Sequence, residues 1–207
     1  MRLELKSDFP VTDAACRKET GKTMKAWFDE IGALVAGGQS RRDAIRWLYD
    51  ASEKNAWWST TLWVEYERKN GIVDKKDGHI EGYNICVTKT VAASVADVYA
   101  VFADAKAWKQ WFGDDAQADV KEQGTFQDSA GHQGEFLRVR KDKDLRFTFS
   151  HPGTDYVTRV DVAVADKGKG KTGITLTHNR LQTREEADGL RAAWSEVLDR
   201  LKQIAES

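Results

Sequence analysis

The spacing of apolar residues along the first third of the chain is typical of amphipathic helices. Between residues 24 and 35 apolar side chains recur every three or four positions, which predicts a helix with one buried face. Similar patterns, begun or ended by capping residues, predict further helices near residues 13–19, 40–51 and 57–70. We therefore expect residues 1–72 to form a small all-α domain.

A short charged junction at residues 73–78 follows, and the period of the apolar residues then changes to two, as in strands. A first strand is expected at residues 83–87, followed by two short helices. Six further strands are predicted at residues 118–122, 125–128, 134–140, 145–151, 156–165 and 173–178. A capping box from Thr183 to Glu186 begins a long C-terminal helix with one apolar face. This order predicts an α+β domain over residues 79–207, in which an antiparallel sheet packs against the last helix.

Composition and charge narrow the classes of function. The 207 residues carry 32 lysine and arginine side chains against 33 aspartate and glutamate side chains, a net charge of −1. Because nucleic-acid-binding proteins usually carry a basic excess, this balance argues against a nucleic-acid partner. No apolar run approaches the roughly 18 residues of a membrane-spanning helix. The first residues also lack the apolar core of a signal peptide, so we expect a cytoplasmic protein with no membrane partner.

The residues that usually carry metal or cofactor chemistry form no convincing motif. Cys16 and Cys86 lie far apart, and the four histidines show no spacing typical of metal ligands. The segment Gly168–Gly173 has the glycine pattern of a dinucleotide loop, but an alternating strand follows where that site needs a helix. We therefore expect no metal, no cofactor and no dependence on disulfides.

A series of short motifs runs through residues 80–206. It comprises Val91-Ala-Ala-Ser-Val-Ala-Asp-Val-Tyr99, Trp108-Lys-Gln-Trp-Phe112, Gly134-Glu-Phe-Leu137, Leu145-Arg-Phe-Thr-Phe149, Gly173-Ile-Thr-Leu-Thr-His178 and Trp194 with Leu198 and Leu201. The series resembles the START-like (SRPBCC, birch-pollen-allergen-like) superfamily, and within it the AHSA-like branch of activator-of-heat-shock-ATPase homologues. The resemblance implies a helix-grip fold, a seven-stranded antiparallel sheet around a long C-terminal helix. The preceding helices resemble a small domain of unknown function.

The phase of the predicted strands places three polar residues at one end of one sheet face. His151 ends one strand, Tyr156 begins the next, and His178 ends the strand after that, all in phase with the apolar residues. In an antiparallel meander the two histidines would lie roughly 10 Å apart with Tyr156 between them. Such a group could orient a polar ligand head or transfer a proton, since histidine titrates near neutrality. The alternative is that these side chains only bond neighbouring loops.

In a helix-grip fold this sheet face bends around a groove that the last helix closes. The predicted lining combines bulky apolar side chains with the three polar residues: Tyr99, Phe102, Trp108, Trp111, Phe112, Phe126, Phe147, Phe149, His151, Tyr156, Val160, Leu176, His178, Trp194 and Leu198. The leading hypothesis is that this groove binds a small hydrophobic molecule. The alternative is that the aromatic side chains fill the core and leave no cavity.

Two other functions stay open at this point. Relatives of the fold include cyclases and hydrolases that act on hydrophobic substrates, so the second hypothesis is an enzyme, although the sequence names no nucleophile. The name of the branch implies a third hypothesis, a chaperone cofactor or other protein-interaction module. In that case the partner would be another protein or a second copy of this chain.

Overall fold

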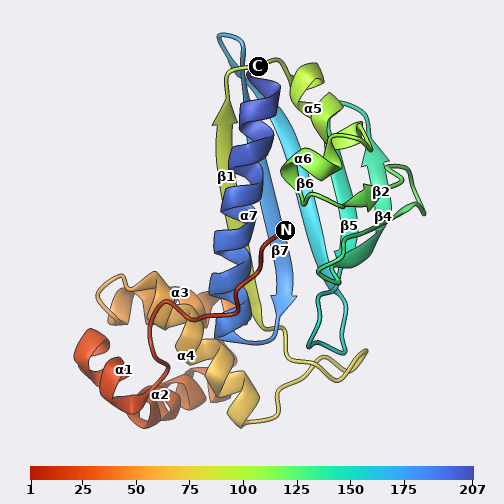
Figure 1. Cartoon of the computed structure of the whole chain (residues 1–207). Helices are drawn as coiled ribbons and strands as arrows, with labels where there is room; N and C mark the ends of the chain where they lie inside the picture. Colours follow the sequence, from red (N-terminus) through yellow and green to blue (C-terminus); the bar gives the residue numbers. More distant parts are fainter. The chain divides into compact units, whose positions relative to one another are not determined.

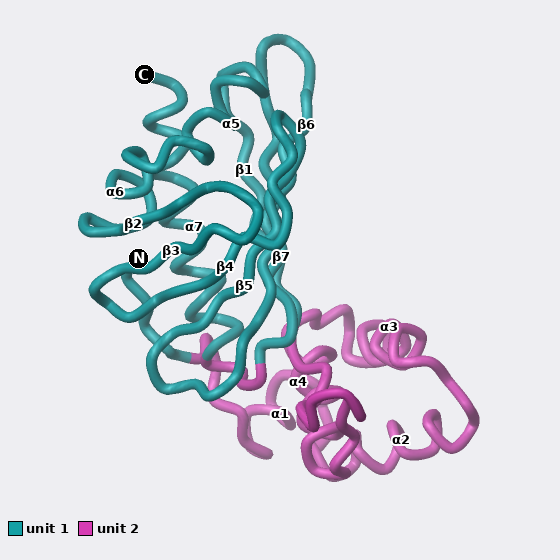
Figure 2. The backbone as a smooth tube through the Cα atoms, turned by 90° about the vertical axis from the view of Figure 1, so that its right-hand side faces the viewer, with its two compact units in different colours: residues 1–6, 84–181, 186–207 teal, residues 7–83, 182–185 magenta.

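The computed structural model describes residues 1–207, and the chain forms two compact units (Figure 2). Unit 1 comprises residues 1–6, 84–181 and 186–207, and unit 2 comprises residues 7–83 and 182–185. The first six residues therefore belong to the unit that contains the sheet, which the local pattern of the sequence did not indicate.

Unit 2 is built from four helices that pack around aromatic side chains. The helices are α1 (Asp13–Thr20), α2 (Met24–Ala36), α3 (Arg41–Ala51) and α4 (Ala56–Lys69). Each helix is preceded by a side chain that accepts a backbone N–H of its first turn, as N-caps do: Thr12, Thr23, Ser40 and Asn55. Trp27 and Trp58 are completely buried between the helices. Large rings thus supply four of the nine buried residues in the core of this small unit.

Residues 182–185 belong to unit 2, and two of their side chains contact other residues of that unit. The Arg184 guanidinium lies 4.4 Å from the ring centroid of Trp57 and 5.2 Å from that of Tyr83. The Gln182 amide donates to the carbonyl of Ile80 at 3.0 Å. Arg184 is buried, and cation–π contacts of this kind stabilise a guanidinium that is withdrawn from water.

Unit 1 is a seven-stranded antiparallel sheet in the order β1-β7-β6-β5-β4-β3-β2, packed against a long helix (Figure 1). The strands are β1 (Tyr83–Val91), β2 (Gln117–Ala118), β3 (Thr125–Gln127), β4 (Gln133–Arg140), β5 (Asp144–Phe149), β6 (Thr158–Gly168) and β7 (Lys171–Leu181). The helices are α5 (Val95–Ala103), α6 (Trp108–Trp111) and α7 (Arg184–Ala205), of which the first two residues of α7 belong to unit 2. This architecture confirms the predicted α+β helix-grip fold.

The pleat of the central strands is the one that the sequence predicts. Phe147 of β5 pairs with Val160 of β6, and Val160 pairs with His178 of β7, so these side chains share a face. All three are buried beneath α7, whose Trp194 lies with its ring 6.3 Å from that of Phe147. Figure 1 shows α7 running along the sheet.

Some strand limits differ from the prediction. β5 ends at Phe149 and β6 begins at Thr158, so His151 and Tyr156 lie in the connection between the two strands and not in the strands themselves. Pro152 has no N–H to offer a sheet, and Gly153 has a φ of 91° that favours glycine, so the chain turns here. The predicted strand at residues 118–122 is reduced to the two residues of β2.

The N-terminal residues lie along α7, as the dark red segment of Figure 1 shows. The carbonyl oxygen of Glu4 approaches the helix so closely that a Cβ on Gly189 would lie 2.3 Å from it. Gly189 therefore permits a close approach of two backbones, which explains a glycine in the interior of an otherwise regular helix.

Candidate functional site

The apolar residues that the sequence predicts around a groove are all buried in unit 1. They are Tyr99, Phe102, Trp108, Trp111, Phe112, Phe126, Phe147, Phe149, Val160, Leu176, Trp194 and Leu198. Trp108 lies at the centre of this group, with its ring centroid 4.6 Å from that of Trp111, 5.1 Å from Phe112 and 5.2 Å from Phe126. Such contacts are those of a packed aromatic core. A role for these rings in ligand binding stays a prediction.

The polar residues predicted at the end of the sheet divide into two separate groups. His151 and Tyr156 meet at Glu186, a residue of α7 that lies 35 and 30 positions from them in the sequence. The His151 Nε2 is 3.1 Å from the Glu186 Oε1, and the Tyr156 hydroxyl donates to the same oxygen. The sequence pattern had assigned Glu186 only to a capping box, because local spacing gives no sign of partners so distant.

Both ring nitrogens of His151 face hydrogen-bond acceptors. The Nδ1 lies 2.9 Å from the carbonyl oxygen of Pro152, opposite the contact with Glu186. A histidine that donates from both nitrogens is an imidazolium. The hydrogen bond to Glu186 accordingly raises the pKa of His151 above its ordinary value, against the opposing effect of burial.

His178 belongs to a different hydrogen-bond chain within the core. The Trp194 indole N–H donates to the His178 Nδ1 at 3.0 Å, and the His178 Nε2 is 2.7 Å from the Thr158 hydroxyl oxygen. The Thr158 hydroxyl in turn donates to the carbonyl of Phe149 at 2.7 Å. Since indole only donates, His178 must be neutral with its proton on Nε2. Complete burial lowers its pKa to about 3.

A second histidine pair, which the sequence analysis did not single out, lies in the loop between β3 and β4. The Asp128 Oδ2 is 2.7 Å from the His132 Nδ1, and the Asp128 Oδ1 accepts the His132 backbone N–H at 2.9 Å. The Met1 ammonium donates to the same carboxylate at 2.9 Å. Gly131 shapes this loop with a φ of 86° and lies against Pro152, which a Cβ would approach to 2.6 Å.

The two partners of this pair are held in opposite charge states. Although burial opposes it, the hydrogen bonds from His132 and from the Met1 ammonium lower the pKa of Asp128, so the carboxylate is ionised. Burial lowers the pKa of His132, so its imidazole is neutral at pH 7 and donates from Nδ1 to Asp128. The remaining nitrogen, Nε2, then carries a lone pair, and no protein group donates to it.

His132 and His151 line one pocket of about 410 Å³ in unit 1, which we call the histidine pocket. Its lining residues are Met1, Arg2, Leu3, Leu5, Ala130, His132, His151 and Pro152. Most of these side chains are apolar, and the two imidazoles supply its buried polar groups. A pocket of this size, with apolar walls and few polar groups, suits a small organic molecule.

The arrangement does not provide the ligand set of a metal site. No group of three or more His, Cys, Asp or Glu side chains lies close enough together to hold a metal ion.

None of the helices combines the length and the apolar character that crossing a membrane requires.

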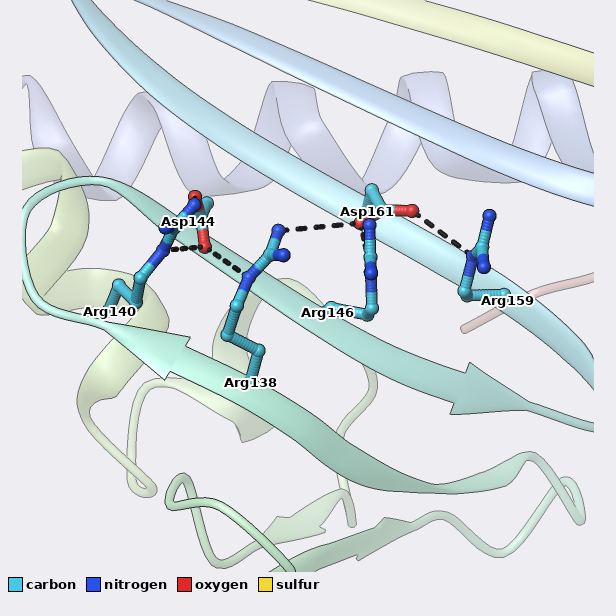
Figure 3. Close-up of polar contacts among 6 residues, drawn as sticks. All are labelled: Arg138, Arg140, Asp144, Arg146, Arg159 and Asp161. Carbon is cyan, nitrogen blue, oxygen red and sulfur yellow. Dashed lines mark hydrogen bonds and ion pairs between the residues drawn. The ribbon is translucent and has the colours of Figure 1, made fainter.

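A second polar cluster covers the outer face of the sheet, and we call it the arginine surface (Figure 3). It consists of four arginines and two aspartates on β4, β5 and β6: Arg138, Arg140, Asp144, Arg146, Arg159 and Asp161. Asp144 pairs with two of the arginines, while Asp161 lies within 4 Å of three of them. The hydrogen bond from Arg140 is the main cause that lowers the pKa of Asp144. Two carboxylates shared by four guanidiniums leave a net positive face.

The seven-stranded antiparallel sheet and the long C-terminal helix packed against it define unit 1 as a helix-grip protein. Residues 92–206 match the model of the family described as Activator of Hsp90 ATPase homolog 1-like protein. The match spans more than half of the chain, which therefore belongs to this family.

Several solved structures share the fold. CalU16 from Micromonospora echinospora aligns with a TM-score of 0.53 at 20% identity, covering 59% of this chain and 75% of that protein. The Aha1 dimer from Colwellia psychrerythraea aligns with a TM-score of 0.52 at 17% identity, covering 60% and 96%. The protein SA2116 of unknown function from Staphylococcus aureus aligns with a TM-score of 0.51 at 19% identity, covering 60% and 93%. None of the curated proteins matches the chain.

Proposed function

We propose that unit 1 binds a small, largely apolar molecule in the histidine pocket. The observation that carries the proposal is a pocket of about 410 Å³ with mostly apolar walls, lined by His132, whose Nε2 has no hydrogen-bond partner in the protein. The body of the ligand would pack against Leu3, Leu5 and Pro152, and its polar head would meet the two imidazoles. Buried polar groups in an apolar pocket orient a ligand because leaving them without a partner is costly.

The proposed ligand lies at one end of the sheet and not in the aromatic core. The aromatic residues named above pack against one another, whereas His132 and His151 face a space that protein atoms do not fill. The hydrophobic class of the ligand is unchanged, since the pocket walls are apolar. The proposed function is binding, and it assigns no reaction to the protein.

The test uses 4-nitroanisole, a small apolar probe without an acidic proton. We expect it to bind the purified protein, and we expect Ala130→Trp to abolish binding by filling the pocket. Ala103→Trp, at an exposed position of α5, is the matched control and should bind as the parent does. Equilibrium dialysis measures both. Failure of the parent protein to bind both 4-nitroanisole and its hydroxyl analogue 4-nitrophenol, or equal binding of 4-nitroanisole by Ala130→Trp, would overturn the proposal.

A second candidate function, docking onto an acidic protein surface, is favoured by the arginine surface. The chain as a whole carries a net charge of −1, yet this sheet face combines four arginines with only two aspartates. The aspartates hold the guanidiniums in place, which reduces the entropy lost when they bind carboxylates of a partner. The family name suggests Hsp90 as the partner to test.

Sedimentation velocity of the protein with purified Hsp90 provides that test. We expect association at low salt that Arg138→Gln combined with Arg146→Gln weakens at least tenfold. The control, Lys18→Gln with Lys25→Gln, removes two exposed charges from unit 2 and should bind as the parent does. The same runs report a homodimer. Equal binding by both double variants, or no association, would contradict this second function.

A further inference from the structure

We propose that the head of the bound molecule is a weakly acidic hydroxyl, a phenol or an enol, whose proton His132 accepts within the histidine pocket. The inference rests on the proposed ligand-binding function and names the chemical class that this pocket selects. Three features of the pocket carry it: the fixed tautomer of His132, the cationic neighbours of its free nitrogen, and the apolar walls.

The Asp128 carboxylate fixes the tautomer of His132. Its two oxygens accept the Nδ1–H and the backbone N–H of His132, at 2.7 and 2.9 Å. A carboxylate with these partners cannot donate, so the imidazole proton stays on Nδ1 and the lone pair stays on Nε2. A ligand that meets this nitrogen must therefore donate a hydrogen bond. An ether, carbonyl or carboxylate oxygen would oppose one lone pair with another.

The charges around the pocket favour an anion once the proton has moved. His151, which donates from both ring nitrogens, lines the same pocket, whereas its counter-ion Glu186 does not. Arg2 and the Met1 residue also line the pocket, and the Met1 ammonium contacts Asp128. A ligand oxygen beside His132 would thus face cationic groups from two segments of the chain, the N-terminal residues and His151. Positive charge at this place stabilises a developing oxyanion.

The proton transfer is balanced and needs no further reactant. The ligand O–H bond breaks, an N–H bond forms on the His132 Nε2, and no atom is oxidised or reduced. The product is an ion pair of an oxyanion with the His132 imidazolium, and Asp128 stabilises that imidazolium through its existing hydrogen bond. An aspartate that orients a histidine base is the arrangement found in acyl-transfer enzymes, although no nucleophilic serine or cysteine lines this pocket.

The test uses 4-nitrophenol, because its anion is yellow and its neutral form is not. At one pH unit below the pKa of the free probe, about a tenth of it is ionised in buffer. We expect at least half of the bound probe to be ionised, which corresponds to a pKa lowered by at least one unit, or tenfold. The matched probe, 4-nitroanisole, has the same ring without the hydroxyl and should bind at least tenfold more weakly.

Variants assign the proton acceptor. His132→Gln should bind 4-nitrophenol in its neutral form, whereas His151→Gln should still ionise it, with a smaller shift. His79→Gln, which replaces a histidine of unit 2, is the control and should behave as the parent does. Circular dichroism establishes that each variant is folded. If His132→Gln is unfolded, the His132 imidazole resonances of the parent protein decide the matter, since they should move to imidazolium positions when 4-nitrophenol binds.

The outcomes separate the inference from the proposed function. Binding of 4-nitrophenol in its neutral form, or equal affinity for both probes, would overturn the inference and leave the pocket as a binding site. Ionisation by a folded His132→Gln variant, or parent His132 resonances that stay in place, would overturn His132 as the acceptor. Failure of both probes to bind would overturn the inference together with the proposed function.

Discussion

The neutral His178 in the core predicts a specific pH dependence of stability. Its folded pKa is lowered to about 3, whereas an ordinary histidine in the unfolded chain titrates at 6.5. Between these values the unfolded chain binds one proton that the folded protein does not bind, so the free energy of unfolding falls as the pH falls. Stability is therefore complete above pH 6.5 and is lost progressively towards pH 3.

The size of the effect follows from the width of that interval. Each pH unit below 6.5 costs about 1.4 kcal/mol, so this one residue removes about 2 kcal/mol between pH 6.5 and pH 5. His178→Asn removes the titrating group, while its amide oxygen can still accept the Trp194 N–H. The variant loses the contact with Thr158 and leaves a small void, which lowers stability at pH 8 by about 2 kcal/mol.

Urea unfolding of both proteins at pH 8, 6.5 and 5 measures the difference. Other groups also titrate: His151, with a raised pKa, stabilises the fold as the pH falls, and His132 acts in the same direction as His178. These contributions cancel in the comparison, because both proteins contain them. We expect the parent protein to lose about 2 kcal/mol more than His178→Asn between pH 6.5 and 5. Equal pH slopes, or a His178 imidazole that titrates near pH 6.5 in the folded protein, would refute the reasoning.

Three further predictions concern packing, a buried ion pair and thiol reactivity. Gly134→Ala should lower the free energy of unfolding by about 3 kcal/mol in urea titrations, because its Cβ would lie 1.8 Å from the carbonyl oxygen of a neighbouring strand. Arg41→Ala leaves the buried Glu67 carboxylate without its 3.0 Å partner, so the free energy of unfolding should fall by about 3–5 kcal/mol. Adding Glu67→Gln removes the unpaired charge and should restore part of that stability. A double variant as unstable as Arg41→Ala would contradict this reasoning. A thiol reagent should modify the exposed Cys86 at once. It should modify the buried Cys16 only when the protein unfolds, because burial raises the pKa of that thiol. Rapid modification of both thiols would contradict the packing of α1.

Much of unit 1 could be predicted from the sequence, because a strand has a fixed period. Within each strand alternate side chains point the same way, so Phe147, Val160 and His178 each fall on the apolar face of their own strand, and the pairing register then brings the three faces together. The apolar face of α7 follows in the same way from helical periodicity. The predicted ends of β5 and β6 were wrong. His151 and Tyr156 lie in the connection between these strands, because Pro152 and its neighbours interrupt the backbone hydrogen bonds there, and the alternation of apolar residues does not mark that point.

The polar site, in contrast, was decided by tertiary structure. Local spacing gave Glu186 a capping role, yet the fold brings it to His151 and Tyr156 across 35 and 30 residues. His132 has no signal of its own, since its partners are an aspartate four residues away in a loop and an N-terminal segment 127 positions from that aspartate. His178 was expected beside Tyr156, but the fold engages its two nitrogens with Trp194 and Thr158.

The sequence by itself therefore determined the elements, their order and the face that each buries, because these depend on short-range periodicity. Tertiary structure alone decided which polar atoms meet, which histidine is charged and which nitrogen stays free. Hydrogen bonds have a range of about 3 Å and strict directions, so they depend on the final placement of each backbone segment. Burial then sets the charge states, and it is a property of the assembled core that no single segment of the chain carries.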